Sequence, residues 1–226
     1  MTTFPIAALF DMDGVLVDNH RYHTESWQQF AARHGRTITP DQYAQFINGR
    51  VAADSMPYVM QRPLLADELH ALAEEKEAIY RDLYASELAP TRGLIEFLTS
   101  LKTHNVPMAV GTSAPVSNIA FTLDGTGIQS YFSAIVDASM IHSGKPDPEI
   151  YLAAAQRVGI SPERCVVFED AFSGIEAGLR AGMAVVALAT THTRDELITT
   201  KAQLIIDDFT QLTYEGLVNL VEGHWH

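Results

Sequence analysis

Two aspartates, Asp11 and Asp13, stand on either side of one methionine at the end of the apolar run IAALF. In an extended strand alternate side chains share a face, so both carboxylates would point the same way, about 7 Å apart at Cα. Like charges raise each other's pKa, and burial disfavours ionisation further. The pair therefore predicts either a positive partner or a chemical task at this point of the chain.

Polar residues also end three other segments of the chain. Thr112 follows PMAV, Lys145 lies in HSGKPDPE, and Glu169 and Asp170 follow CVVF. Taken singly, the threonine and the two acids could cap helices, and the lysine could be a surface charge. Because ligands of open α/β sheets bind beyond the carboxyl ends of the strands, the joint placement favours one shared site.

The elements that would position these residues alternate from about residue 90 onward. Helical periods in LIEFLTSLKTHN, EIYLAAAQRV, SGIEAGLRAG and RDELITTK lead into the apolar runs PMAVGT, CVVFED, AVVALA and QLIID. Such alternation predicts β-α-β units around a parallel sheet. With IAALFD as a further strand, we expect about six strands in a Rossmann-like α/β core.

Residues 19 to about 88 break this alternation. The segments HTESWQQFAARHG, TPDQYAQFI, AADSMPYVM and ADELHALAEEKEAIYRDLY all have helical character. Four helices after the first strand are too many for an ordinary connection. We therefore expect an all-helical domain over residues 18–88, inserted into an α/β core formed by residues 1–17 and 89–226.

The composition limits the classes of partner. The 226 residues are 47% hydrophobic and 19% charged, without an apolar stretch of membrane-spanning length or a signal-peptide pattern at the start. A net charge of −13 argues against binding to nucleic acid or anionic membranes. It does not exclude a small phosphorylated metabolite, since a bound metal reverses the local charge. We expect a cytoplasmic monomer.

Taken in order, these motifs resemble those of the haloacid-dehalogenase-like superfamily of hydrolases. DMDGV is similar to its first motif, GTS to its second, Lys145 within GKPDPEIY to its third and EDAFSGIEAG to its fourth. The helical insert resembles the C1 cap of the superfamily, and LAPTRGLIEFL its return into the core. The resemblance covers essentially the whole chain, and it is closest to the β-phosphoglucomutase-like branch.

The resemblance implies a role for each core residue. Asp11 would attack phosphorus and form an aspartyl-phosphate, which divides one difficult displacement into two. Asp13 would protonate the leaving alkoxide and later take a proton from water. Lys145 and Thr112 would hold the oxygens of the transferred phosphoryl group, and Ser113 of the second motif would lie on the substrate side.

The resemblance also implies a Mg²⁺ cofactor. Its ligands would be the Asp11 side chain, the Asp13 backbone carbonyl and the Asp170 side chain, with Glu169 bound directly or just behind them. Mg²⁺ accepts a few carboxylates together with phosphate oxygens and waters.

Four residues of the insert are expected at the substrate. His23, four residues before a tryptophan, matches the branch pattern, and Lys76 lies in AEEKEAIY of the last helix. Gly49 and Arg50 occupy the loop FINGR, where the specificity loop of the cap should be, and Arg50 could grip an anion. Alternatives without a function stay open: His23 could be a packed side chain, and Lys76 and Arg50 could be solvated charges.

This loop departs from true β-phosphoglucomutases, which carry Lys-Gly-x-Ser-Arg with an arginine for the second phosphate of the sugar. Here the loop is Asn48, Gly49, Arg50, Val51, Ala52, so the expected lysine is asparagine and the expected arginine is alanine. A mutase must hold a bisphosphate while it reorients. The loss favours hydrolysis, although Arg50 could substitute from a displaced position.

We therefore expect a Mg²⁺-dependent phosphohydrolase of a small phosphate ester, with a sugar phosphate favoured and pyrophosphate or a nucleotide-derived phosphate still open. A β-phosphoglucomutase is the alternative enzyme. A true dehalogenase has no need of Asp13, which disfavours that chemistry. A non-catalytic phospho-receiver or binding protein is the remote alternative, because receivers are about half this length and have no helical insert.

Overall fold

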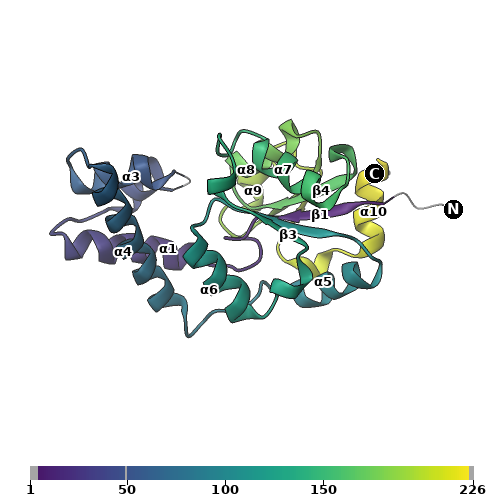
Figure 1. Ribbon diagram of the computed structural model, residues 1–226, viewed down its shortest axis with the longest axis horizontal. Helices are drawn as coiled ribbons and strands as arrows, with labels where there is room; N and C mark the ends of the chain where they lie inside the picture. The colour runs from purple at the N-terminus through teal and green to yellow at the C-terminus, as the bar shows by residue number, and fades with distance from the viewer. Residues whose placement is uncertain (1–4, 49, 224–226) are drawn as a thin grey trace. The chain divides into compact units, whose positions relative to one another are not determined.

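The computed structural model describes residues 5–48 and 50–223, and it divides the chain into two compact units. The first unit runs as far as Asp18 and resumes at Ala89, and the second is the helical segment Asn19–Leu88 between them (Figure 1). Among these described residues, no helix has both the length and the apolar character that crossing a bilayer requires.

A six-stranded parallel sheet forms the centre of the first unit within the described residues. The strands are β1 (Ala7–Phe10), β2 (Met108–Gly111), β3 (Ala134–Val136), β4 (Cys165–Glu169), β5 (Ala184–Leu188) and β6 (Leu204–Ile206). Their order is β3-β2-β1-β4-β5-β6. Strand β1 is central: Leu9 lies opposite Ala109 of β2 on one side and Val167 of β4 on the other. The expected Rossmann-like α/β core is confirmed.

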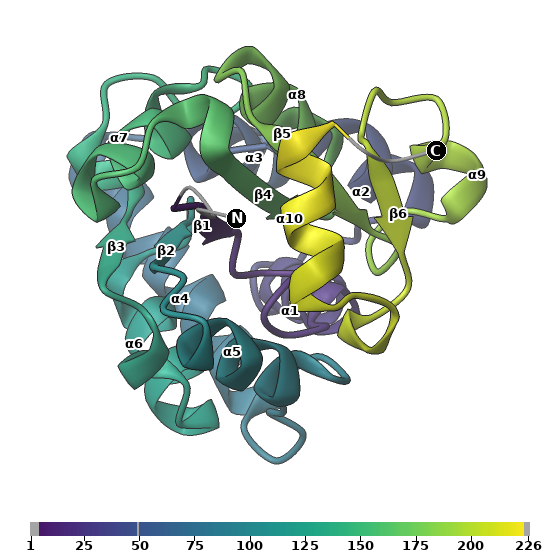
Figure 2. The same cartoon turned by 90° about the vertical axis from the view of Figure 1, so that its right-hand side faces the viewer.

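Helices cover both faces of this sheet (Figure 2). They are α5 (Leu94–Thr103), α6 (Val116–Thr126), α7 (Glu149–Val158), α8 (Phe172–Arg180), α9 (Arg194–Leu197) and α10 (Tyr214–Glu222), with 3₁₀ turns η1 (Gln129–Tyr131), η2 (Ala138–Met140), η3 (Pro162–Arg164) and η4 (Phe209–Gln211). Alternation along β1 separates the two cores: Phe10 packs with α5, α6 and α10, whereas Leu9 packs with α7, α8 and α9. Both faces are thus buried, which explains the nearly continuous apolar runs of the strands.

The helical unit consists of α1 (His20–Arg33), α2 (Pro40–Phe46), α3 (Ala52–Met60) and α4 (Ala66–Tyr84). Helix α2 begins at a capping box, in which Thr39 and Gln42 each accept a backbone hydrogen bond from the other, with Pro40 in the first turn. Phe30 of α1, Met56 of α3 and Ile79 of α4 share one buried apolar core. The helical unit therefore has a hydrophobic core of its own, formed by side chains of its own helices.

The two aspartates of the first motif lie beyond the first strand, and not along it as expected. Strand β1 ends at Phe10, and the chain then turns so that the amides of three later residues point at the carbonyl oxygen of Met12. Gly14 has φ +74°, a conformation that glycine adopts without strain. Asp11 and Asp13 therefore belong to a turn, with Asp11 buried and Asp13 half-buried.

A close backbone contact stabilises the return of the chain into the α/β unit. Gly93, at the start of α5, has φ +77°, and a Cβ there would lie 2.6 Å from the backbone nitrogen of Thr210. Gly127 has a similar φ of +70° but open space around it. Comparing substitutions at the two glycines therefore separates the free-energy cost of a side chain at positive φ from the cost of a steric clash with Thr210.

We expect Gly93→Ala to lower the free energy of unfolding by about 3 kcal/mol, because it adds a backbone clash to an unfavourable φ angle. Gly127→Ala should cost about 1 kcal/mol, from the φ angle alone. Urea denaturation of both variants measures the difference. Equal losses would show that the contact with Thr210 contributes nothing.

Candidate active site

Four charged residues meet at the carboxyl ends of the central strands: one follows β1, one lies in the loop before α7, and two lie at the end of β4 and just after it. Lys145 Nζ lies 2.6 Å from Asp11 Oδ1 and 2.6 Å from Glu169 Oε1, so one ammonium bridges two carboxylates. Asp170 follows Glu169 directly and completes the cluster. The carboxylates are withdrawn from solvent, with 8%, 1% and 5% of Asp11, Glu169 and Asp170 exposed. The structure thus brings together four of the expected site residues.

The protonation of this cluster departs from that of free side chains. Burial raises the pKa of the Asp11 carboxyl to about 7, an effect that attraction by Lys145 reduces and repulsion by Glu169 increases. Burial, and then repulsion by Glu169 and Asp11, raises the pKa of Asp170 well above its usual value. Burial acts to lower the pKa of the Lys145 ammonium, but the two carboxylates outweigh it and raise that pKa.

The donor set fits a divalent cation. Asp11, Glu169 and Asp170 each offer a carboxylate oxygen, and these oxygens lie within 4.8 Å of one another. One lysine can neutralise only one of the three buried carboxylates, so a further cation is needed if all three are to be ionised. Oxygen ligands of this kind suit hard cations such as Mg²⁺, Mn²⁺ and Ca²⁺.

The loop after β1 and the loop after β4 lie against each other at this cluster. A Cβ on Gly14 would come within 2.0 Å of Asp170 Oδ2, so only glycine fits between the turn and the carboxylate. The Thr190 hydroxyl donates to the carbonyl oxygen of Gly14 over 2.5 Å, and the nearby Thr191 side chain acts to lower the pKa of the Asp170 carboxyl, against the larger effect of burial. Neither threonine was expected from the sequence, since both follow β5 without a recognisable motif.

Thr112 and Ser113 occupy the end of β2, next to β1. Thr112 is buried, its amide donates to the carbonyl oxygen of Val136, and its hydroxyl accepts from the amide of Ala114 over 3.0 Å. Ser113 is exposed. The structure therefore places Thr112 at the expected strand end and leaves the Ser113 side chain accessible.

The loop that carries Lys145 is tied to the helix that follows it. Glu149, the first residue of α7, accepts hydrogen bonds from the amides of His142 and Ser143 at 2.9 Å and 2.8 Å. Asp147 accepts from the amide of Glu149 over 3.0 Å. These bonds fix both sides of Lys145 without using its ammonium.

The helical unit brings His23 and Lys76 together. Lys76 Nζ lies 2.9 Å from His23 Nδ1 and 3.0 Å from Glu77 Oε1, and the His23 ring stacks on Tyr80 with centroids 3.9 Å apart. Only 3% of Lys76 is exposed, so the solvated alternative for this lysine is wrong. A lysine is rarely this buried unless it is paired, and Glu77 provides the pairing charge here.

The other two residues expected in the insert have different outcomes. Arg50, between α2 and α3, is exposed. Exposure fits a solvated arginine, and it equally fits an arginine that binds an anion from solution. Gly49 lies outside the described residues.

Tyr151 is a member of the cluster that the motifs did not identify. Its hydroxyl donates to Glu169 Oε1 over 2.6 Å, and its ring centroid lies 5.0 Å from Lys145 Nζ. It follows Lys145 by six residues, in the segment GKPDPEIY. In the sequence, Tyr151 is a tyrosine on an otherwise apolar helix face, and that pattern alone predicts only a packed side chain.

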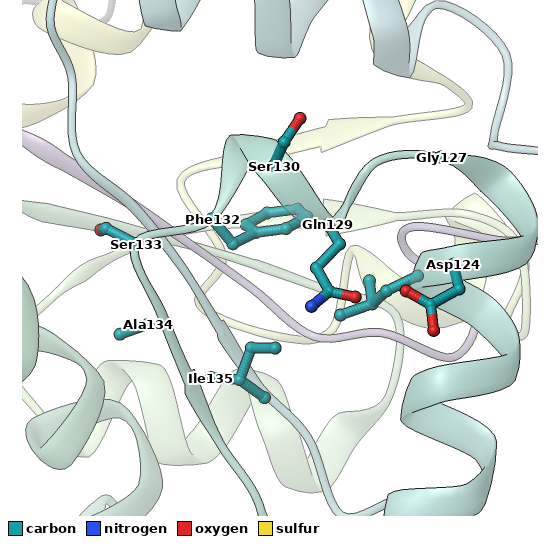
Figure 3. A pocket seen from close by; sticks show the side chains of 9 residues that line it. Asp124, Gly127, Gln129, Ser130, Phe132, Ser133, Ala134 and Ile135 are labelled. Atoms are coloured by element: carbon teal, nitrogen blue, oxygen red, sulfur yellow. The ribbon is translucent and has the colours of Figure 1, made fainter.

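A surface hollow beside the edge strand β3 contains none of these residues (Figure 3). It has a volume of about 710 Å³ and is lined by Leu123, Asp124, Gly127, Gln129, Ser130, Phe132, Ser133, Ala134 and Ile135. Asp124 is its one ionisable lining residue. The hollow therefore lacks the groups that chemistry would need.

Comparisons with known proteins agree with this geometry. The chain is 33% identical to a phosphorylated carbohydrates phosphatase of Thermotoga maritima over 181 residues, which are 78% of this chain and 82% of that protein. A haloacid dehalogenase hydrolase of family IA, variant 3, from Entamoeba histolytica superimposes with a TM-score of 0.90 at 30% identity, covering 96% and 99% of the two chains. A β-phosphoglucomutase from Clostridium difficile gives a TM-score of 0.83 at 26% identity, with 98% and 99% covered.

The family model described as haloacid dehalogenase-like hydrolase matches residues 7–182, which include the complete acidic cluster. This match confirms the resemblance carried by the four motifs. The chain belongs to the haloacid dehalogenase-like hydrolases.

Proposed function

We propose that this protein is a Mg²⁺-dependent phosphohydrolase that acts on a small sugar phosphate through a phosphorylated Asp11. The observation that carries the proposal is the ammonium of Lys145, which bridges Asp11 and Glu169 inside a buried acidic cluster. A negatively charged phosphoryl group can approach a carboxylate nucleophile only if positive charge is held beside that nucleophile, and the ammonium of Lys145 supplies such charge.

The first step transfers the phosphoryl group to the enzyme. A carboxylate oxygen of Asp11 attacks phosphorus, and the bond from phosphorus to the ester oxygen breaks. Asp13 gives its proton to the departing alkoxide, which leaves as an alcohol. Lys145 already lies at hydrogen-bond distance from Asp11, and it stabilises the phosphoryl oxygens together with Thr112.

The second step regenerates the enzyme. Asp13, now a carboxylate, takes a proton from water while the water oxygen attacks the phosphorus of phospho-Asp11. The acyl phosphate bond breaks, phosphate leaves and Asp11 recovers its carboxylate. The half-buried position of Asp13 suits this role, because a proton carrier must reach both water and the leaving group.

Asp11, Asp170 and the backbone carbonyl of Asp13 are the groups we propose as Mg²⁺ ligands, with Glu169 beside them. When bound, Mg²⁺ would neutralise negative charge on the transferred phosphoryl group. The excess of buried carboxylates over the single lysine supports this assignment.

The substrate class follows from the relatives and from the helical unit. The similar phosphatase of Thermotoga maritima is named for phosphorylated carbohydrates. We propose that His23 and Lys76 contact the leaving group and that Gly49 and Arg50 contribute specificity. A cytoplasmic location and a monomeric state remain predictions.

We expect Asp11→Asn to abolish phosphate release from a panel of sugar monophosphates, because an amide cannot act as the nucleophile. EDTA should abolish the activity of the wild type, and added Mg²⁺ should restore it. Asp124→Asn, at an exposed aspartate of α6, is the matched control and should leave the rate unchanged. A rate for Asp11→Asn above a few per cent of the wild-type rate would contradict the proposal.

The structural similarity to a β-phosphoglucomutase makes a mutase the second candidate. We expect glucose 1-phosphate with a trace of glucose 1,6-bisphosphate to yield free phosphate if it is a substrate at all, because Ala52 replaces the arginine that would grip a second phosphate. Phosphate release and isomer formation are measured in the same incubation. Glucose 6-phosphate that accumulates without free phosphate would identify a mutase.

A further inference from the structure

The buried hydroxyl of Tyr151 is aimed at the acidic cluster from inside the protein. Tyr151 lies on α7, no part of it is exposed, and its hydroxyl donates to Glu169 Oε1 over 2.6 Å. The same oxygen accepts from Lys145 Nζ over 2.6 Å. A neutral donor and a charged donor thus share one carboxylate oxygen, which fixes its position from two directions.

The other oxygen of Glu169 is bonded to the backbone. Glu169 Oε2 accepts from the amides of Asp170 at 3.0 Å and Ala171 at 3.2 Å. A carboxylate has about four lone-pair sites, and here all four are matched to a donor. Glu169 is therefore bonded to the lysine, to the tyrosine and to the turn that carries Asp170.

The space around the Glu169 carboxylate is closed as well. A Cβ on Gly174 of α8 would lie 1.7 Å from Glu169 Oε1. Tyr151 approaches from α7 and Gly174 from α8, so two helices define where the carboxylate can lie. This independent contact indicates that the position of the carboxylate, and not only its charge, is specified by the fold.

We propose that Tyr151 is a positioning residue for the phosphoryl-transfer site: it holds Glu169, which in turn orients Lys145 and the turn of Asp170. In this arrangement the Glu169 carboxylate is fixed beside Asp11 and Asp170, the other two acids of the cluster. The inference rests on the proposed function and adds Tyr151 to the residues that determine the geometry of the site.

The hydroxyl, and not the ring, carries this role. Phenylalanine would fill nearly the same volume, but among the residues that the structure describes it would leave Lys145 as the only side-chain donor to Glu169 Oε1. The ammonium would then bind Glu169 more strongly at the expense of Asp11, and the carboxylate could shift against the amides of Asp170 and Ala171. Loss of the hydroxyl should therefore weaken cation binding and slow the chemical step, with little effect on substrate binding.

The test compares Tyr151→Phe with Tyr131→Phe. Tyr131 is a half-buried residue of the same unit whose hydroxyl pairs with Thr99 Oγ1 at 2.9 Å, away from the cluster. We expect Tyr151→Phe to raise the Kd for Mg²⁺, measured by calorimetry without substrate, about 10-fold or more, and to lower kcat about 10- to 100-fold. KM should change less than about threefold, since the ring and the substrate-facing residues remain. Tyr131→Phe should match the wild type in all three values.

A Mg²⁺ Kd for Tyr151→Phe within twofold of the wild type would overturn the inference, whatever the change in kcat. Gly174→Ala provides a second route if Tyr151→Phe does not fold: its methyl group displaces the Glu169 carboxylate directly, and it must weaken Mg²⁺ binding in the same way. An unchanged Kd in Gly174→Ala would likewise contradict the proposal. Failure of the proposed function is distinct, because it would appear as a wild type that binds Mg²⁺ without hydrolysing any phosphate ester.

Discussion

The burial of three carboxylates around a single ammonium is the constraint on which the rest of the site depends. Asp11, Glu169 and Asp170 are almost entirely removed from water, and Lys145 is shared by two of them. An isolated buried carboxylate is costly, and neighbouring like charges increase the cost. The fold therefore maintains an electrostatic strain at one point, which a cation and a phosphoryl group are suited to relieve.

The sheet order explains how this point arises. Strands β1 and β4 are neighbours at the centre of the sheet, so the turn after Phe10 and the turn after Glu169 emerge side by side. Lys145 reaches the same place from the loop before α7, which Glu149 holds in place through two backbone amides. Gly14 and Gly174 admit the two carboxylates that any Cβ would displace. The charge cluster is thus positioned mainly by backbone geometry.

Much of this arrangement could be predicted from the sequence. Apolar runs ending on acids and a threonine predicted the parallel sheet and the cluster at its carboxyl edge, and helical periodicity located the insert. The sequence also grouped Lys145 with these strand ends, but this lysine lies in the loop before α7, well beyond the end of β3. Strand β3 was not singled out, because it is three residues long and two of them are only half-buried, so no continuous apolar run marks it. The extended conformation expected for Asp11 and Asp13 was wrong, since a glycine permits a turn that alternation cannot reveal.

The contacts that depend on distant parts of the chain could not be predicted. The hydroxyl of Tyr151 reaches Glu169 only because α7 packs against β1, the neighbour of β4, and Thr191 lies near Asp170 only because β5 pairs with β4. Neither residue has a local pattern that distinguishes it from a packed side chain. For Lys76 the sequence left both a substrate contact and a solvated side chain open, and only the packing of α4 against α1 shows that the lysine is buried beside His23.

The central claim is that a divalent cation compensates the buried acids, and thermal unfolding with Mg²⁺ or EDTA at pH 5 and pH 8 tests it most directly. The raised pKa of Asp11, about 7 against 3.8 in the unfolded chain, means that the metal-free protein loses stability as pH rises through this window. Mg²⁺ at about 100 times its Kd should add about 2.7 kcal/mol at pH 8, or roughly 5–10 °C in Tm, and much less at pH 5. Asp170→Asn should lose this gain. An equal effect of Mg²⁺ at both pH values, or none at pH 8, would contradict the account.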